Sequence, residues 1–452
     1  MNRRGFMGHA LTGAAGLTLG AALPAFSLNR SGDILVLALI GCGSRGRTVL
    51  EGIVKENDHV AVKYLCDVNE TLGGIAEDIQ KYKERQGYAP VFTTEMKKAF
   101  DDKEVDAVVI CTPEHWHVLA AVWALQAGKH VYVEKNPTLS IWEGQQLIKA
   151  ADKYKKTLQI GFQNRSAPYA FSARDYIKSG KLGKIVHVKC FNLLTGSKWT
   201  AVPDTPIPAG LNWDAWQGPA KAVPYNPNRH SMTGRGGWLD FWAYGGGALS
   251  DDASHVMDLA RLVLGDPTHP RSVYSSGGNN GFQSQKETPE FLNITYDFGD
   301  FTMTCESGSC TKYMTKEGPD VRYGTKWPYW PQNSTRIELY GTERLMYLGR
   351  HGVGWQVMET DGKIVDMDKG YFPDKFHQKN FIDSIRNGSR PNGDVRQGHL
   401  SASLVHLADI AYRTGNQLLY FDNRTERFTN SEDANSLLRG SSRAPYAVPE
   451  NV

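Results

Sequence analysis

ILVLALIGCGSRG, residues 34–46, decides the fold of this chain, because it joins an apolar run to a glycine-rich turn. A continuous apolar run over 34–40 is typical of a strand buried on both faces of a parallel sheet. Gly41, Gly43 and Gly46 follow in the G-x-G-x-x-G spacing, at the start of a helical segment. Such glycines permit a tight turn and let the backbone approach a pyrophosphate, whose charge would lie at the helix N-terminus.

An acidic residue after the next expected strand narrows the choice of ligand. Asp67 follows Gly46 by about 20 residues, the distance at which a carboxylate can bind the adenosine ribose hydroxyls. Such a carboxylate favours NAD over NADP. Ser44 and Arg45 complete the turn, and the guanidinium of Arg45 could reach a 2′-phosphate, which leaves NADP open. The alternative interpretation is an ordinary strand–helix turn without a nucleotide.

Apolar runs and amphipathic segments alternate up to residue 160, which predicts an α/β fold that begins with a Rossmann domain over 33–160. Its later strands are expected at 60–66, 107–111, 130–133 and 157–160, with a helix over 115–127. After residue 161 strands follow one another, at 184–194, 290–298, 301–307, 335–341 and 354–360. They predict an α+β domain over 161–420 with a large, mainly antiparallel sheet. A helical stretch over 376–412 and a C-terminal tail over 421–452 complete the chain.

Composition excludes several classes of protein. The 452 residues are 40% hydrophobic and 22% charged, which is the mixture of a soluble globular protein. The net charge is only +3, which argues against nucleic acid as a partner. Beyond the first residues no apolar run reaches the roughly 20 residues of a membrane span. Six scattered cysteines do not build a disulfide fold, although Cys305 and Cys310 could pair.

Residues 1–27, MNRRGFMGHALTGAAGLTLGAALPAFS, have the character of an export leader. Arg3 and Arg4 precede Phe6 and a mildly apolar stretch rich in alanine and glycine, which resembles a Tat signal for the export of folded proteins. We therefore expect a periplasmic or otherwise exported protein. The alternative is a poorly ordered tail in which the paired arginines occur by chance.

Two polar motifs follow expected parallel strands, at the sheet edge where ligands bind in such folds. They are CTPEHWH at 111–117 and EKNP at 134–137. A third motif, GGGALSDDASHVMD at 245–258, lies in the second domain. A helix that starts near Asp251 would place Asp251 and His255 on one face, with Asp258 one turn further.

With these motifs the chain resembles the Gfo/Idh/MocA family, named for glucose-fructose oxidoreductase and inositol dehydrogenase. The family's T-P-x-x-x-H motif is matched by Thr112, Pro113 and His117, and its E-K-P motif by Glu134 and Lys135. Asn136 stands before the proline and departs from the commonest form of the second motif. The resemblance implies that both motifs contact the cofactor.

The resemblance also implies a catalytic set of Lys135, Asp251 and His255. When hydride leaves a secondary alcohol, a base must stand within hydrogen-bond reach of the hydroxyl. His255 is the natural base, Asp251 could orient it or hold a neighbouring hydroxyl, and Lys135 would favour the alkoxide. The alternatives are a solvated lysine, a surface Asp/His contact, and a metal held by Asp251, His255 and Asp258. Because no further His/Glu set has matching spacing, no metal is expected.

Other side chains are expected near the substrate. Gln163 and Arg165 follow the strand at 157–160 and could meet the cofactor or substrate. Trp238, Trp242 and Tyr244 precede the Asp/His helix, and aromatic faces of this kind stack on sugar rings. Plain core packing is the alternative for each aromatic residue. The aromatic loop over 199–238 is expected to form a wall of the site.

These features predict an NAD(P)-dependent oxidoreductase that acts on a hydroxyl of a sugar, glycoside or related polyol and holds its cofactor tightly. A lyase, epimerase or glycosidase that oxidises its substrate only transiently remains an alternative. A third possibility is a sugar-binding protein without turnover. The expected partner is a small carbohydrate, and homo-oligomerisation is an expectation from the family resemblance.

Overall fold

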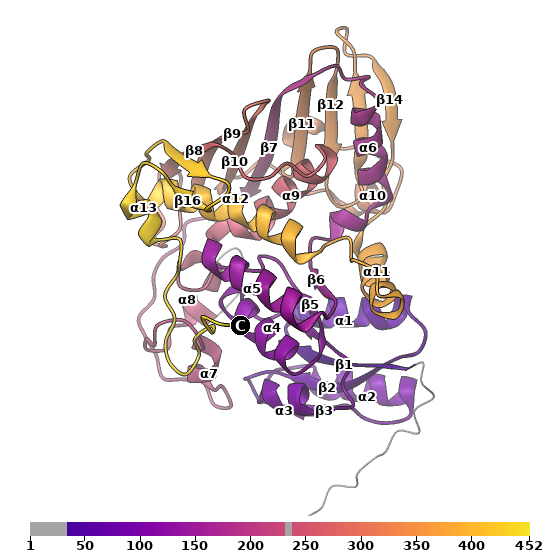
Figure 1. The fold of residues 1–452 in the computed structure, drawn as a ribbon, viewed down its shortest axis with the longest axis vertical. Coiled ribbons are helices and arrows are strands. Elements are labelled where there is room, and N and C mark those ends of the chain that lie inside the picture. The colour runs from indigo at the N-terminus through magenta and orange to yellow at the C-terminus, as the bar shows by residue number, and fades with distance from the viewer. Residues whose placement is uncertain (1–33, 231–236) are drawn as a thin grey trace, which may run out of the picture. The chain divides into compact units, whose positions relative to one another are not determined.

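The computed structural model describes residues 34–230 and 237–452, and the statements below concern these residues. The leader expected over residues 1–27 lies outside them. Among the described residues, no helix combines the length and the apolar character that a membrane crossing requires. Two sheets organise this part of the chain, one built from residues 35–160 and the other from residues 185–428 (Figure 1).

The first sheet has six parallel strands in the order β3-β2-β1-β4-β5-β6, which confirms the predicted Rossmann-type class. The strands are β1 (Leu35–Ile40), β2 (Val60–Cys66), β3 (Val91–Thr93), β4 (Ala107–Ile110), β5 (His130–Val133) and β6 (Leu158–Ile160). The helices between them are α1 (Ser44–Glu56), α2 (Ile75–Gln86), α3 (Met96–Asp101), α4 (His117–Gln126) and α5 (Ile141–Tyr154). Strand β3 is not foreseen, because it is short and its first residue, Val91, is exposed.

The apolar run of β1 is buried because helices cover both faces of this sheet. Ala38 and Ile40 belong to a cluster formed with α3, α4 and α5. Leu37 and Leu39 face the other way and belong to a cluster formed with α1 and α11 (Asp374–Asn387). The strand therefore carries no polar side, as expected for the centre of a parallel sheet.

The second sheet has ten strands in the order β14-β13-β12-β11-β7-β10-β9-β8-β15-β16. The strands are β7 (Ile185–Thr195), β8 (Ser272–Gly278), β9 (Phe291–Asp297), β10 (Thr302–Thr311), β11 (Arg336–Gly341), β12 (Leu345–Gly349), β13 (Gly354–Met358), β14 (Ile364–Asp368), β15 (Leu419–Asp422) and β16 (Arg427–Phe428). Neighbours pair antiparallel except β7 and β10, which are parallel. This confirms the predicted mainly antiparallel sheet. All six cysteines are free thiols, so Cys305 and Cys310 do not pair.

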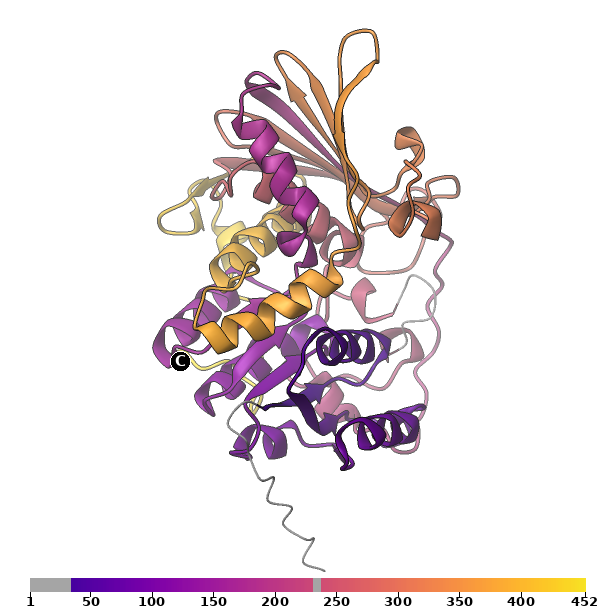
Figure 2. The ribbon, with the colours of Figure 1, turned by 90° about the vertical axis from the view of Figure 1, so that its right-hand side faces the viewer.

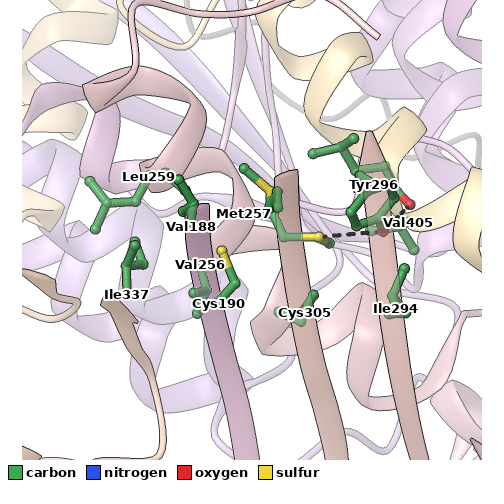
Figure 3. Close-up of a cluster of buried hydrophobic side chains, with 14 of the residues drawn as sticks. Val188, Cys190, Val256, Met257, Leu259, Ile294, Tyr296, Cys305, Ile337 and Val405 are labelled. Atoms are coloured by element: carbon green, nitrogen blue, oxygen red, sulfur yellow. Dashed lines mark hydrogen bonds between the residues drawn. The ribbon is translucent and has the colours of Figure 1, made fainter. Parts of the chain in front are cut away.

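Helix α9 (Ser254–Val263) packs across one face of this sheet and carries His255 into the molecule. Val256, Met257 and Leu259 of α9 meet inward-facing residues of β7, β9, β10 and β11 (Figure 3). The hydroxyl of Tyr296 donates to the Leu404 carbonyl at 2.7 Å and lies 3.6 Å from the Met257 sulfur. The site's helix is thus held by apolar burial, the main favourable contribution to folding.

Three further helices pack around the two sheets. They are α6 (Pro168–Lys178), α11 and α12 (Val395–Arg413), and of these α12 contacts elements of both sheets. In Figure 1, α12 crosses between α5 and the second sheet, and in Figure 2, α11 lies beside α1. Helix α12 also contacts α9, so it packs both against α5 of the first domain and against the helix that carries His255.

Candidate functional site

The turn after β1 depends on its glycines, two for close backbone packing and one for an open side. A Cβ on Gly41 would lie 2.7 Å from the Cys111 carbonyl oxygen, and a Cβ on Gly46 would lie 2.1 Å from that of Gly41. The protein's own backbone therefore requires both glycines, and Gly41 also has a φ of +90°. For Gly43, by contrast, no atom of the described residues lies within 4 Å of the Cβ position. This open side fits the expected pyrophosphate.

A cleft of about 320 Å³ extends from this turn along the C-terminal edge of the parallel sheet. It is walled by the glycine turn, by the ends of β2 and β4, and by aromatic residues of the loop over 199–238. Its lining includes Ser44, Arg45, Asp67, Thr112, Pro113, Trp216, His230 and Trp238. Most of the predicted cofactor contacts therefore lie in one cleft.

Asp67 has the position and chemistry of a ribose acceptor. One of its carboxylate oxygens accepts from the backbone N–H of Cys42 at 2.8 Å. Burial raises the pKa of this carboxyl, although that N–H opposes the shift. Arg45 instead pairs with Glu134 at 3.0 Å and with Asp374 at 2.9 Å. Since Arg45 is held by these two carboxylates, the cleft suits NAD, whose ribose carries no 2′-phosphate.

His117 supports the cleft wall through both of its ring nitrogens. Its side chain is buried, and its two ring nitrogens lie 2.7 Å from the Asn136 carbonyl oxygen and 2.8 Å from that of Thr112. The imidazole therefore joins the T-P-x-x-x-H turn to the loop that carries Lys135. The sequence spacing places the ring near the site, but both nitrogens are used within the protein.

A second cavity of about 320 Å³ adjoins the first, and Arg45, Cys111, Thr112 and Trp238 line both. The structure brings the three predicted catalytic residues together in this second cavity. Its lining also includes polar and aromatic groups from several elements: Glu134, Lys135, Gln163, Asp251, Asp252, His255, Arg350, His351, Phe372 and Asp374.

Lys135 forms the central ion pair of the cavity. Its Nζ lies 2.8 Å from the Asp251 carboxylate, and its side chain is 14% exposed. Burial alone would lower the pKa of the ammonium, but the carboxylates of Asp251 and Glu114 outweigh burial, and the pKa is raised. Lys135 is therefore a cation at neutral pH. It can stabilise a developing alkoxide, and it is not itself a free base.

His255 is a buried, neutral imidazole. Burial and the neighbouring cations Arg350 and Lys135 hold its pKa well below the usual range. Its Nδ1 has no hydrogen-bond partner among the described residues, and its ring packs edge-on against Phe162. Asp251 pairs with Lys135 and not with His255. A π-helical turn over Leu249–Ala253 precedes α9, so the simple four-residue helical spacing does not apply there.

Gln163 braces the wall between the two cavities, as a residue of the predicted site. Its amide nitrogen donates to Glu134 at 2.9 Å and to the Tyr132 hydroxyl at 3.0 Å. Burial tends to raise the pKa of Glu134, yet Arg45 and Lys135 outweigh burial and lower it. Glu134 is therefore an ionised carboxylate, and it pairs with the Arg45 guanidinium.

Asp252 and Arg350 are among the residues of the cavity that the sequence pattern misses. Asp252 accepts from Arg350 at 2.7 Å and also pairs with Lys316. Arg350 follows β12, about a hundred residues from the Asp/His motif, and no local pattern marks it. Asp252 directly follows Asp251 in the sequence, and this pair of carboxylates is the local signal that could have indicated Asp252 as a site residue.

Arg165 and Tyr244 lie outside the cavity, against the prediction. Arg165 is buried and pairs with Asp258 at 2.6 Å and with Asp266 at 2.8 Å. Tyr244 packs against His115 and Trp216 in an aromatic cluster. Because Asp258 is used by Arg165, the set of Asp251, His255 and Asp258 does not converge on a metal position. Trp238 lines both cavities, as predicted for a ligand wall.

Two family models match this chain. The first is described as an oxidoreductase family with an NAD-binding Rossmann fold, and it matches residues 35–162. The second is the C-terminal alpha/beta domain of the same oxidoreductase family, and it matches residues 172–318 and 344–448. Together they cover well over half of the chain and both sheets.

Individual relatives agree with these matches. Levoglucosan dehydrogenase of Pseudarthrobacter phenanthrenivorans is 27% identical over 41% of this chain, and the match spans 39% of that protein. The scyllo-inositol 2-dehydrogenase (NAD(+)) of Bacillus subtilis is 25% identical over 78% of this chain and 87% of its own length. The WlbA dehydrogenase of Bordetella pertussis, solved with NADH and UDP-GlcNAcA, has a TM-score of 0.61 at 19% identity. That structure covers 86% of this chain and 98% of its own, and it shows the shared fold.

The glycines of the turn allow a first prediction. Gly43→Ala leaves the thermal midpoint unchanged and weakens NADH binding by roughly tenfold or more, since the new methyl group occupies the open side of the turn. Gly46→Ala loses stability as well, because its Cβ would meet the Gly41 carbonyl. Fluorescence titration with NADH and thermal melts measure both effects. Gly73→Ala is the control, since its Cβ position is also open. Equal binding by all three variants contradicts the assignment.

A second prediction concerns Arg165. Arg165→Met leaves the buried Asp258 unpaired and lowers the free energy of unfolding by about 3–5 kcal/mol. The partly exposed Arg174 is the control, and Arg174→Met costs less than about 1 kcal/mol. Urea denaturation measures both values. If Arg165→Met leaves stability unchanged and impairs ligand binding, the structural role is contradicted and Arg165 belongs to the ligand site.

Proposed function

The chain belongs to the Gfo/Idh/MocA family of oxidoreductases, and on that premise we propose that it oxidises a hydroxyl of a sugar, glycoside or polyol with NAD. One observation carries the proposal: the Lys135 ammonium, 2.8 Å from Asp251, shares a cavity with the neutral His255. That cavity adjoins the dinucleotide cleft, so a substrate carbon there would lie beside the nicotinamide end.

The residues supply the two groups that alcohol oxidation needs. NAD, when bound, accepts the hydride from the carbon that bears the hydroxyl. The hydroxyl proton passes to the imidazole of His255, which lines the cavity, so that the O–H bond breaks as the C–H bond does. Lys135 donates a hydrogen bond to the oxygen while negative charge develops there, and Asp251 holds the ammonium in place.

The charges of the cavity favour an uncharged substrate. Each of the three cations that line it among the described residues is paired with a carboxylate. Arg45 pairs with Glu134 and Asp374, Lys135 with Asp251, and Arg350 with Asp252. Among the described residues no lining cation is left over to bind an acidic substrate, whereas paired charges offer many hydrogen bonds to hydroxyl groups. Trp238 and Phe372 add apolar faces for a sugar ring.

We further propose that the protein is exported with its cofactor bound. The twin arginines at residues 3 and 4 support export of a folded chain. Trp216, His230 and Trp238 support slow release, because they line the cofactor cleft together with the glycine turn. An exported enzyme of this kind would regenerate NAD within the site. A homo-oligomer remains part of the proposal on the family resemblance alone.

A third prediction tests the reaction. The protein is incubated with NAD and a panel of candidate substrates that includes levoglucosan, scyllo-inositol and common hexoses. We expect reduced nicotinamide to form, and its absorbance measures the rate. Lys135→Ala and His255→Ala each lower kcat by about 10²–10⁴-fold, since each removes a group that acts on the reacting oxygen. Lys81→Ala, which removes an exposed lysine, is the control.

The same assay separates the alternatives. Product without lasting reduction of nicotinamide supports transient oxidation by a lyase, epimerase or glycosidase. Saturable sugar binding without any product supports a sugar-binding protein. Wild-type rates in both the Lys135 and His255 variants contradict the assigned site.

A fourth prediction concerns the cofactor. Native mass spectrometry of protein purified without added nucleotide shows the mass of bound NAD. Trp238→Ala speeds release roughly tenfold, because it removes a wall shared by both cavities. Trp142→Ala, which removes a tryptophan of α5 outside the cleft, is the matched control. Complete loss of NAD from the wild type on simple dilution counts against tight binding.

A further inference from the structure

A small cavity of about 30 Å³ is lined in part by Asn136, which follows Lys135, and it shares no lining residue with the cofactor cleft. Its inner walls include Glu114, Asn136, Ser250 and Asp409. Its outer wall includes Trp242 and the exposed Arg413, whose guanidinium lies 5.2 Å from the tryptophan ring. A polar space of this size is large enough to hold a water molecule.

Two buried carboxyl groups line this cavity, and each has one oxygen without a hydrogen-bond partner among the described residues. Glu114 is 1% exposed, and among the described residues its Oε2 has no partner. Asp409 is 6% exposed, and its Oδ1 likewise has none there. An unpaired carboxylate in such a place is costly, so buried acids of this kind tend to hold a proton or to share one with water.

The charges around the two acids differ. Burial raises the pKa of Glu114 to about 7, with Lys135 opposing the shift and Asp251 adding to it. Burial raises the pKa of Asp409 well above its ordinary value, although Arg413 opposes the shift. His406, the other titratable group of the wall, has its pKa lowered by burial to about 3 and stays neutral. Near neutral pH, Glu114 therefore gains and loses a proton readily, and Asp409 keeps one.

Glu114 is also placed next to the reacting groups. It stands in the turn after β4, and its Oε1 accepts from the Asn136 N–H at 3.5 Å. Asn136 directly follows Lys135, and Ser250 directly precedes Asp251. The two residues of the central ion pair thus have their chain neighbours in the wall of the small cavity.

We propose that Glu114 takes up the proton released by alcohol oxidation and passes it through the small cavity to Asp409 and to solvent at Arg413. The proposal rests on the proposed function. Oxidation sends the hydride to NAD and leaves one proton on His255, where Arg350 and Lys135 disfavour it. The proton enters the Lys135–Asp251 pair, and the pair delivers one proton to the Glu114 carboxylate, so the pair's charge is unchanged. Asp409 releases a proton outward and receives one from the cavity.

The kinetic test compares isosteric variants on a substrate found with the panel. In the wild type kcat falls as the pH drops through about 7, because Glu114 must be ionised to accept a proton. Glu114→Gln lowers kcat by about tenfold or more and removes this acid limb, with KM changed less than about threefold. Asp409→Asn lowers kcat and increases the solvent isotope effect. Glu114→Asp restores part of the rate and the acid limb.

Glu143→Gln is the matched control. Burial also raises the pKa of Glu143 to about 7, but this carboxylate accepts from the Leu139 N–H and does not line the small cavity. Its variant keeps the wild-type kcat and acid limb. A Glu114→Gln enzyme with the wild-type pH profile, or with a change in KM alone, overturns the relay.

Infrared titration of the resting protein separates failure of the relay from failure of the proposed function. The carbonyl band of protonated Glu114, identified by its loss in Glu114→Gln, titrates near pH 7 and shifts rapidly on transfer to D₂O. If that band does not titrate, the relay is wrong even where sugars are oxidised. If it titrates and no sugar is oxidised, the proposed function fails and the relay fails with it, leaving a buried acid in exchange with solvent.

Discussion

The ion pair between Lys135 and Asp251 is the contact on which the site depends. Lys135 follows β5 of the parallel sheet, and Asp251 precedes α9, which packs beneath the antiparallel sheet. Removing an ammonium from water costs several kcal/mol, and only nearby carboxylates offset this cost. Because Asp251 and Glu114 supply them, the lysine stays charged inside the molecule. The same pair brings the edge of one sheet to the helix of the other, so the cavity exists only where the two halves meet.

The first sheet follows closely from local sequence. Strands β2 and β5 coincide with the runs at 60–66 and 130–133, since strands buried on both faces leave a mainly apolar signal, broken here only by Lys63 and His130. The second sheet is harder to predict. Strands such as β8, SVYSSGG, and β14, IVDMD, have one solvated face and many small or polar residues. Their pairing depends on neighbours far along the chain, which no local pattern contains.

The site shows the same division between local and distant information. Glycine spacing identified the cofactor turn because close backbone contacts admit no other residue at Gly41 and Gly46. Sequence spacing could not show that the Arg165 side chain points into the interior, where it pairs with Asp258. Nor could it find Arg350, whose role arises only when the turn after β12 reaches Asp252. Residue type indicates possible chemistry, and tertiary packing decides which partner each charge receives.

The paired charges of the cavity bear both on the substrate and on the buried acids behind Lys135. Every lining cation of the described cavity has its own carboxylate, so the site at rest has no charge to spare for a substrate. Oxidation of a neutral alcohol removes a hydride and creates one proton in this balanced environment. Arg350 and Lys135 oppose a lasting charge on His255. A pair of buried acids behind Lys135 is where such a proton would be tolerated, because protonation relieves their own cost of burial. The arrangement that pairs every described cation at the front of the site thus favours a proton path through the buried acids behind Lys135.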